Sequence, residues 1–128
     1  YALEDVDLFN ILCIPRTGMT SGNNAMTDTE ADSVMSVAES YCESKRAFLI
    51  MDTPLGIDDL QKIKNWVGSR GNLRNKNAAL YYPRVNIPDP LNNFRLRSVG
   101  ACGTMAGLFA RTDSNRGVSI NYKMLYLN

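Results

Sequence analysis

The sequence predicts an α/β fold: a single domain with a mostly parallel sheet of three or four strands flanked by helices. Three observations predict it, namely short apolar runs, an amphipathic helix between the first two runs, and turn residues after each run. The chain has 128 residues, the length of one ordinary domain, and its 45% hydrophobic content is enough for a sizeable core. A strand, a helix and a second strand within ~45 residues predict a βαβ unit, whose crossover is nearly always right-handed.

Three apolar runs are predicted to form the parallel strands. They are residues 8–14, 47–51 and 78–82, and their length suits buried strands better than helices. Prolines or turn residues follow each of them, and residues 16–25 between the first strand and the first helix are predicted to be a loop. Residues 119–127 alternate enough to predict a last strand.

The helix of the βαβ unit is predicted to begin at Thr27. Thr27 and Glu30 have the Thr-x-x-Glu spacing of a capping box, in which each side chain accepts the other residue's backbone amide. Apolar residues then recur at steps of three and four, so one helix face is apolar. Lys45 and Arg46 suit its C-terminal end, where cations offset the helix dipole.

Two further helices are predicted in the second half. The apolar spacing of Ile57–Val67 predicts an amphipathic helix, and Asp58 and Asp59 fall in its first turn. Negative charge there offsets the helix dipole, so we interpret this pair as capping residues rather than as a carboxylate site. The small-residue segment Val99–Ala110 predicts the last helix. Its glycines cost about 1 kcal/mol each relative to alanine, which suggests close backbone packing.

Residues 84–97, with their prolines and asparagines, are predicted to form a long loop. Arginines flank aromatic residues in and around this segment, a pattern similar to a single-strand nucleic-acid surface. A solvated loop or a protein contact is the competing interpretation. The nearly balanced charge of 14 basic and 13 acidic residues favours no direct nucleic-acid partner. The residues concerned are Tyr81, Tyr82, Arg84, Phe94, Arg95 and Arg97.

The chain contains no histidine, which excludes Ser-His, Cys-His and His-ligated metal sites. Asp52 is the best candidate for chemistry, because doubly wound folds commonly place their sites at the carboxyl ends of parallel strands. A small α/β enzyme or phosphate-binding domain centred on Asp52 is therefore the alternative function. Asp-Thr-Pro after a strand is also ordinary turn chemistry. We expect no catalytic residue, no metal ligand, no cofactor and no enzyme activity.

Cys13, Cys42 and Cys102 are an odd number of cysteines, far apart and in apolar surroundings. Their spacing resembles neither a disulfide framework nor a metal site, so we expect reduced thiols in the core. No stretch approaches the ~18 consecutive apolar residues that a membrane span needs. We expect a soluble protein with no membrane insertion.

Charge is distributed unevenly along the chain. Residues 1–60 hold eleven acids and three bases, whereas residues 61–128 hold two acids and eleven bases, giving −8 and +9. The two halves could neutralise each other within one chain. Alternatively, complementary faces on neighbouring copies would favour head-to-tail association into open helical assemblies.

Several short segments, in order over residues 5–118, resemble contractile tail-sheath proteins of phages, tailocins and injection systems. Each segment is short, but the ordered set is fairly specific. The segments are Asn10–Pro15 (NILCIP), Tyr41–Glu43 (YCE), Ala47–Pro54 (AFLIMDTP), Ala79–Pro83 (ALYYP) and Ala106–Asp113 (AGLFARTD), followed by Arg116-Gly117.

The resemblance implies a structural subunit that stacks as six-membered rings into a helical sleeve around an inner tube and contracts to drive that tube through an envelope. The implied partners are other sheath subunits, the inner tube protein, and baseplate and tail-terminator proteins. The implied location is a virion tail or injection particle assembled in the bacterial cytoplasm. Terminal arms that add strands to a neighbour's sheet are also implied.

The resemblance also suggests residues for subunit contacts or structural pairs. We take these candidates to be Glu39, Glu43, Arg84, Arg111, Asp113 and Arg116. The chain starts at Tyr1 without a methionine, and we expect residues 1–128 to be the α/β core of a larger sheath subunit. Residues 119–128 depart from the family pattern, which continues with an aromatic residue and a Lys-Ala-Pro stretch, so their continuation is open.

Overall fold

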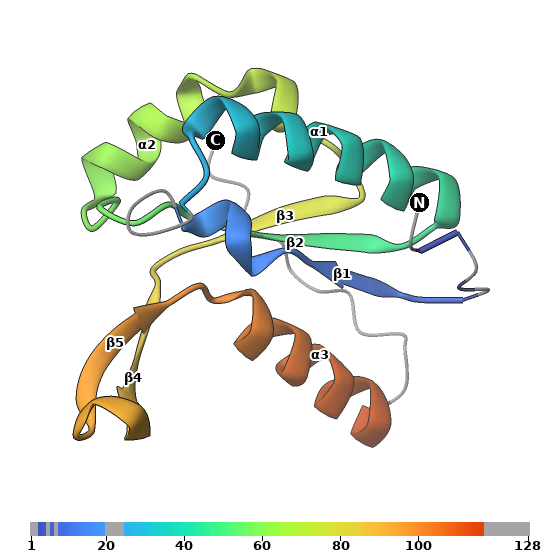
Figure 1. The fold of residues 1–128 in the computed structure, drawn as a ribbon. Coiled ribbons are helices and arrows are strands. Elements are labelled where there is room, and N and C mark those ends of the chain that lie inside the picture. Colours follow the sequence, from blue (N-terminus) through green and yellow to red (C-terminus); the bar gives the residue numbers. More distant parts are fainter. Residues whose placement is uncertain (1–2, 5, 7, 20–24, 117–128) are drawn as a thin grey trace.

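Three short strands form the parallel sheet that the sequence predicts (Figure 1). They are β1 (Ile11–Cys13), β2 (Phe48–Asp52) and β3 (Ala78–Tyr81), in the spatial order β1-β2-β3. The computed structural model describes residues 3–4, 6, 8–19 and 25–116. The strand predicted at residues 119–127 lies outside the described part of the chain.

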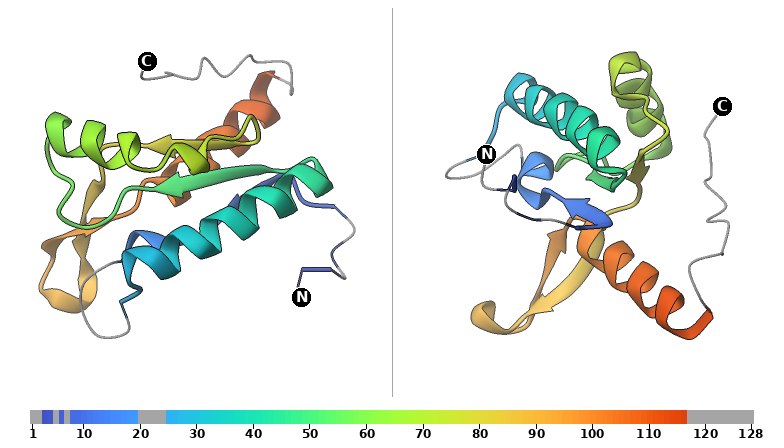
Figure 2. Two further views of the ribbon diagram at one scale, coloured as in Figure 1. Left: turned by 90° about the horizontal axis from the view of Figure 1, so that it is seen from above. Right: turned by 90° about the vertical axis from the view of Figure 1, so that its right-hand side faces the viewer.

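Helices cover both faces of this sheet. Among the described residues, α1 (Asp28–Lys45) and α2 (Leu60–Gly68) lie on one face, and α3 (Cys102–Arg116) lies on the other (Figure 2). Short 3-10 turns occur at Pro15–Gly18 and Gly71–Leu73. This arrangement confirms the single α/β domain. None of the described helices is long and apolar enough to cross a membrane.

The central strand explains why the sheet has two covered faces. Successive side chains of a strand point to opposite faces. Leu49 and Met51 of β2 pack against α1, whereas Ile50 packs against α3. The sheet thus has a second core on its α3 side. There Phe109 of α3 packs in an edge-to-face geometry against Phe48 and Tyr81, at ring-centroid distances of 6.4 Å and 6.1 Å.

The start of α1 follows the predicted capping chemistry, and Lys45 lies in its last turn as expected. The Thr27 side chain accepts a 3.2 Å hydrogen bond from the Glu30 amide, and the Thr27 amide donates to Glu30 Oε2 at 2.8 Å. Arg46 then ends the helix with a left-handed φ of 57°. Helix α2 begins at Leu60, three residues later than the predicted Ile57, because Asp59 is its N-cap and accepts the Lys62 amide at 2.7 Å.

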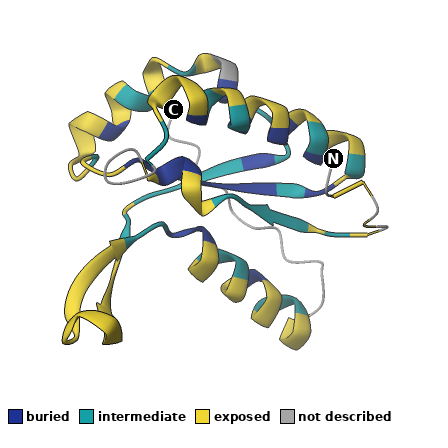
Figure 3. Ribbon diagram, viewed as in Figure 1, coloured by how far each residue is buried: buried dark blue, intermediate teal, exposed yellow. Residues whose placement is uncertain are grey.

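The loop predicted at residues 84–97 is wrong. The segment is an antiparallel hairpin of β4 (Val85–Asp89) and β5 (Arg95–Val99), with a 3-10 turn at Pro90–Asn92. Pro88 is compatible with this hairpin because each of its strands is an edge, where a missing amide donor is tolerated. Figure 3 shows the hairpin extending from the domain with most of its surface exposed.

Helix α3 also begins later than predicted. Val99 ends β5, and the helix starts only at Cys102. The two intervening residues carry the chain from the hairpin to the end of the sheet, past Asp52.

Candidate functional site

Asp52, the sequence's best candidate for chemistry, lies at the carboxyl end of β2 and is closed off from solvent. Its side chain is 1% exposed. Its Oδ1 accepts a 2.8 Å hydrogen bond from the backbone N–H of Cys102, the first residue of α3. Its Oδ2 has no hydrogen-bond partner among the described residues. Asp52 therefore satisfies the first backbone amide of α3, one of those that have no partner within the helix.

Glycines allow the backbone to pass close to Asp52. A Cβ on Gly100 would lie 2.0 Å from Asp52 Oδ2, and one on Gly18 would lie 2.9 Å from Asp52 Cβ. A side chain at Gly100 would thus displace either Asp52 or the start of α3. Close packing was expected of the glycines in the last helical segment. Within the described chain Gly100 meets that expectation, whereas Gly103 and Gly107 face open space.

Two of the cysteines meet beside this carboxylate. The Cys13 thiol donates to the Cys102 carbonyl oxygen at a Sγ–O distance of 3.6 Å. Burial raises the pKa of both thiols, and the Asp52 carboxylate raises the pKa of Cys102 further. Both are therefore neutral, weakly nucleophilic thiols near pH 7. Cys42 is also a free, buried cysteine, as expected for core thiols. No cluster suited to a metal ion occurs in the described ranges.

Arg84 ties the base of the hairpin to the end of the sheet. Its Nη1 donates to the carbonyl oxygens of Thr53 at 2.6 Å and Gly18 at 3.1 Å. Its Nε donates to Ser98 Oγ of β5 at 3.1 Å. Arg84 was considered both as a nucleic-acid contact and as a subunit contact or structural pair. These hydrogen bonds give it a structural role within the chain, because they orient the hairpin.

The two glutamates expected to make contacts lie on α1 in different environments. Glu39 is 5% exposed, and its Oε1 has no partner among the described residues. Burial raises the pKa of Glu39. Glu43 lies at the surface, where Asn75 donates to it at 3.4 Å and Lys76 pairs with it at 3.3 Å. These two contacts lower the pKa of Glu43.

The remaining contact candidates lie near the end of α3. Arg111 and Arg116 are exposed and, with Thr112 and Asn115, line a small surface hollow. Asp113 is half-buried. They lie far along the chain and across the sheet from the α1 glutamates, so the six candidates do not form one cluster (Figure 1).

The residues of the nucleic-acid hypothesis are not brought together on one surface. Tyr81 is half-buried against Phe109, and the guanidinium of Arg84 is engaged with backbone carbonyls. Arg95 and Arg97 remain exposed, on β5 of the hairpin. The geometry therefore offers no continuous row of aromatic and basic side chains of the kind that tracks a single strand.

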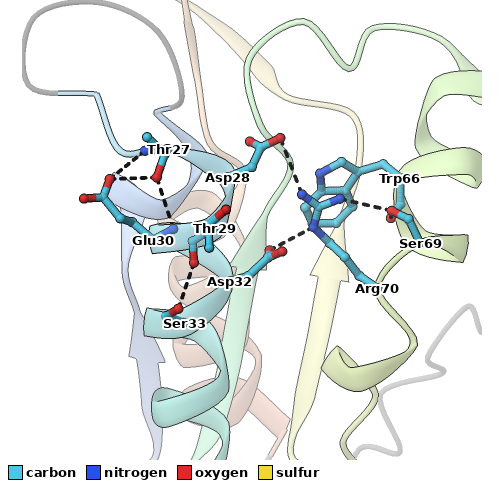
Figure 4. A network of polar contacts seen from close by, with 9 residues as sticks. All are labelled: Thr27, Asp28, Thr29, Glu30, Asp32, Ser33, Trp66, Ser69 and Arg70. Atoms are coloured by element: carbon cyan, nitrogen blue, oxygen red, sulfur yellow. Dashed lines mark hydrogen bonds and ion pairs between the residues drawn. The ribbon is translucent and has the colours of Figure 1, made fainter.

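A polar cluster joins the start of α1 to the end of α2 (Figure 4). Arg70 Nε pairs with Asp32 at 2.8 Å and its Nη2 with Asp28 at 3.5 Å, while its guanidinium lies 4.4 Å from the centre of the Trp66 ring. The Arg70 side chain is only 13% exposed. Together with the Lys76–Glu43 pair, this cluster neutralises part of acidic α1 with bases from the second half of the chain. Neutralisation within one chain, the first of the two expectations about charge, thus occurs in part.

The most unusual surface of the domain is the exposed β4–β5 hairpin, which was not predicted from the sequence. Four apolar side chains of the hairpin are exposed, by 42% to 97% of their area. The alternation in Val85–Asp89 and Arg95–Val99 was the signal that could have identified the strands. Its polar and apolar members do not reveal which face is covered, because neither strand packs extensively on another element. The four side chains are Ile87, Leu91, Phe94 and Leu96.

Comparison with known proteins adds no assignment to this geometry. No family model matches the sequence, and no curated protein matches it at a significant level.

Proposed function

We propose that the chain is a structural subunit of a contractile tail sheath. It would polymerise with its own copies into a helical sleeve around an inner tube, and the sleeve would contract to drive the tube through a target envelope. The proposal draws on the ordered segments that resemble this family, on the places of those segments in the fold, and on the exposed apolar side chains of the β4–β5 hairpin.

The observation that carries the proposal is where the resembling segments lie. The segment Asn10–Pro15 contains β1, Ala47–Pro54 contains β2, and Ala79–Pro83 contains most of β3. Ala106–Asp113 lies within α3 and includes Phe109, which packs against β2 and β3. Segments widely separated in sequence thus meet in the parallel sheet and in the core between that sheet and α3. A framework common to a family would be expected to lie in such buried positions.

The β4–β5 hairpin supports an assembling role. An isolated two-stranded hairpin is marginally stable in water and normally needs further strands or a packed face. Here both strands are edges, and every residue from Asn86 to Ser98 except Asp89 is exposed. Open edges and uncovered apolar side chains favour contact with another chain.

Charge favours a head-to-tail mode for that contact. Helix α1 lies on one face of the sheet and carries five acids and one base, although Arg70 and Lys76 pair with three of those acids. The hairpin and α3 lie on the other face and carry four arginines and two acids (Figure 1). Patches of opposite charge on different faces of one subunit favour heterologous contacts, which continue into rings or helical filaments.

The resemblance extends the proposal to the remaining partners. These are the inner tube, the baseplate and the tail terminator, and the location is a virion tail or an injection particle. The alternative of a small enzyme centred on Asp52 gains no support from the geometry, since that carboxylate is buried and bonded to the start of α3.

Electron microscopy combined with sedimentation velocity tests the proposal directly. The full-length protein would be expressed alone and concentrated. We expect tubes or stacked rings and a sedimentation coefficient that rises steeply with concentration. A compact monomer at every concentration would overturn the proposal and return attention to Asp52.

A further inference from the structure

The tip of the β4–β5 hairpin is built to hold apolar side chains outward. The tip, defined here as Leu91, Phe94 and Leu96, is 97%, 69% and 73% exposed. Asp89 closes the turn from both sides, because its carbonyl oxygen accepts the Phe94 amide at 2.9 Å and its Oδ1 accepts the Leu91 amide at 3.0 Å. A tip ordered before binding loses less conformational entropy when it meets a partner.

Phe94 has an unusual backbone conformation for its size. Its φ is +57°, and that of the preceding Asn93 is +50°. The left-handed region is uncommon and energetically unfavourable for bulky residues. The cost brings no packing within the domain, because the Phe94 ring stays largely in solvent. Packing of the Phe94 ring against another chain would offset this unfavourable backbone conformation.

The hairpin also carries charge beside its apolar tip. Arg95 faces Asp89 across the hairpin, and Arg97 faces Ile87, so the flank has two bases for one acid. The surface that fits this tip is therefore apolar, with an acidic edge.

A hollow with these properties lies at the start of α1 of the same chain. Its volume is about 420 Å³. Ala25, Met26 and Val34 supply apolar lining. Glu30 supplies a carboxylate whose pKa is lowered by hydrogen bonds from Thr27 and by the charge of Arg16, which also lines the hollow, so Glu30 is ionised near pH 7. Three acids at the start of α1, Asp28, Glu30 and Asp32, lie near two bases, Arg16 and Arg70, so this edge keeps a net negative charge. We call it the α1 hollow. Its lining residues are Arg16, Ala25, Met26, Thr29, Glu30, Ser33 and Val34.

The hairpin extends away from the α1 hollow of its own chain. The hairpin lies on the α3 side of the sheet and α1 lies on the other side, although both the hairpin and the start of α1 are at the same end of the domain (Figures 1 and 2). Two copies stacked with the α3 side of one toward the α1 side of the next bring tip and hollow together. Repeating that contact gives an open assembly.

We infer that the hairpin tip of one copy docks into the α1 hollow of a second copy. This inference rests on the proposed function and names one contact of the assembly. Leu91 and Phe94 enter the apolar part of the hollow, and Arg95 and Arg97 lie toward the acidic first turn of α1. The contact uses side chains and requires no exchange of strands.

Cross-linking between two differently labelled chains locates the contact. A Leu91→Cys chain is mixed with a Ser33→Cys chain, treated with a short bismaleimide, and analysed by denaturing gel and mass spectrometry. We expect a heterodimer linked through the two new thiols. The matched control is Ser44→Cys, an exposed serine in the last turn of α1, which should give no such product. The wild-type chain controls for its own cysteines.

A second measurement separates this inference from the proposed function. Leu91→Asp should raise the concentration at half-assembly about tenfold or more, as expected for an apolar hot spot. Leu60→Asp is the control, because Leu60 is 56% exposed and an acid suits the first residue of α2. If the Leu91→Asp chain assembles at the same concentration as the wild type, the docking is overturned but the proposed function is not. The same holds if the Ser44→Cys chain gives as much cross-linked heterodimer as the Ser33→Cys chain. A strictly monomeric wild type would overturn both.

Discussion

The parallel sheet and the β4–β5 hairpin use similar residues in opposite ways. β2 has helices on both of its faces, and its Leu49 and Ile50 are each 1% exposed. The hairpin places Leu96 in a strand as well, yet leaves it 73% exposed. Apolar area removed from water stabilises a fold by roughly 25 cal/mol per Å². The sheet therefore stabilises the domain, whereas the hairpin leaves most of its apolar area in water.

The largest expected effect contrasts one leucine from each region. Leu49→Ala should lower the free energy of unfolding by about 2–5 kcal/mol, because it leaves a cavity between β2 and α1. Leu96→Ala should change it by less than about 0.5 kcal/mol, since that side chain is in solvent. Urea denaturation of the two variants measures both values. A large loss at Leu96 would mean that the hairpin is packed in solution and would break the comparison.

A pair of glycines tests the junction between the two regions. Gly100→Ala should destabilise the domain by about 1–3 kcal/mol, because its Cβ would overlap Asp52. Gly103→Ala should stabilise it by up to about 1 kcal/mol, since Gly103 lies in α3 and its added Cβ meets no described atom. The midpoints of urea unfolding give the two signs. Equal effects of the two substitutions would show that Asp52 is not in contact with residue 100.

The anchoring of the hairpin is tested by Arg84→Ala. Loss of the guanidinium removes the hydrogen bonds to Thr53, Gly18 and Ser98 that connect hairpin and sheet. We expect faster amide exchange throughout β4 and β5, with β2 amides almost unchanged, because local opening differs from global unfolding. Arg97→Ala is the matched control and should leave exchange unchanged. Uniformly faster exchange in Arg84→Ala would make hairpin and sheet one cooperative unit.

The smallest expected effect is a difference in pH dependence between two glutamates of α1. Burial raises the folded-state pKa of Glu39 above its usual value, so the folded protein binds more protons than the unfolded chain just above that value. Its contribution to stability therefore falls as pH rises through this window. Glu39→Gln should remove this fall and stabilise the protein at pH 7.

Glu43 serves as the control with the opposite sign. Its folded-state pKa is lowered, so its contribution is present above the usual glutamate pKa and is lost as pH falls through the lowered value. Thermal unfolding of both Gln variants between about pH 3 and pH 7 measures the two slopes. A rise in stability with pH that is traced to Glu39 would show that its carboxylate is paired in solution.

Local chemistry explains which elements were predicted well. The capping box at Thr27 and Glu30 set the start of α1 because it depends on residues three apart. The buried runs identified β1, β2 and β3, because a strand covered on both faces is apolar along its length. The hairpin was missed because Pro88 and the asparagines near its turn are also typical of loops.

The role of Asp52 was open between two interpretations until the fold was known. Its place after a strand fits both a reactive group and a turn, and the structure shows a third use at the start of α3. The partner is the Cys102 amide, 50 residues away in sequence. No pattern along the chain reports that distance in space.

The sequence by itself determined the parallel βαβ framework, the capped first helix and the absence of histidine chemistry, because each depends on residue type and short-range spacing. Tertiary structure alone decided that Asp52 is enclosed, that Arg84 orients the hairpin, and that the hairpin's apolar side chains stay in solvent. Those features depend on which distant segments meet. The packing of the whole chain, rather than any local pattern, determines which segments meet and which remain uncovered.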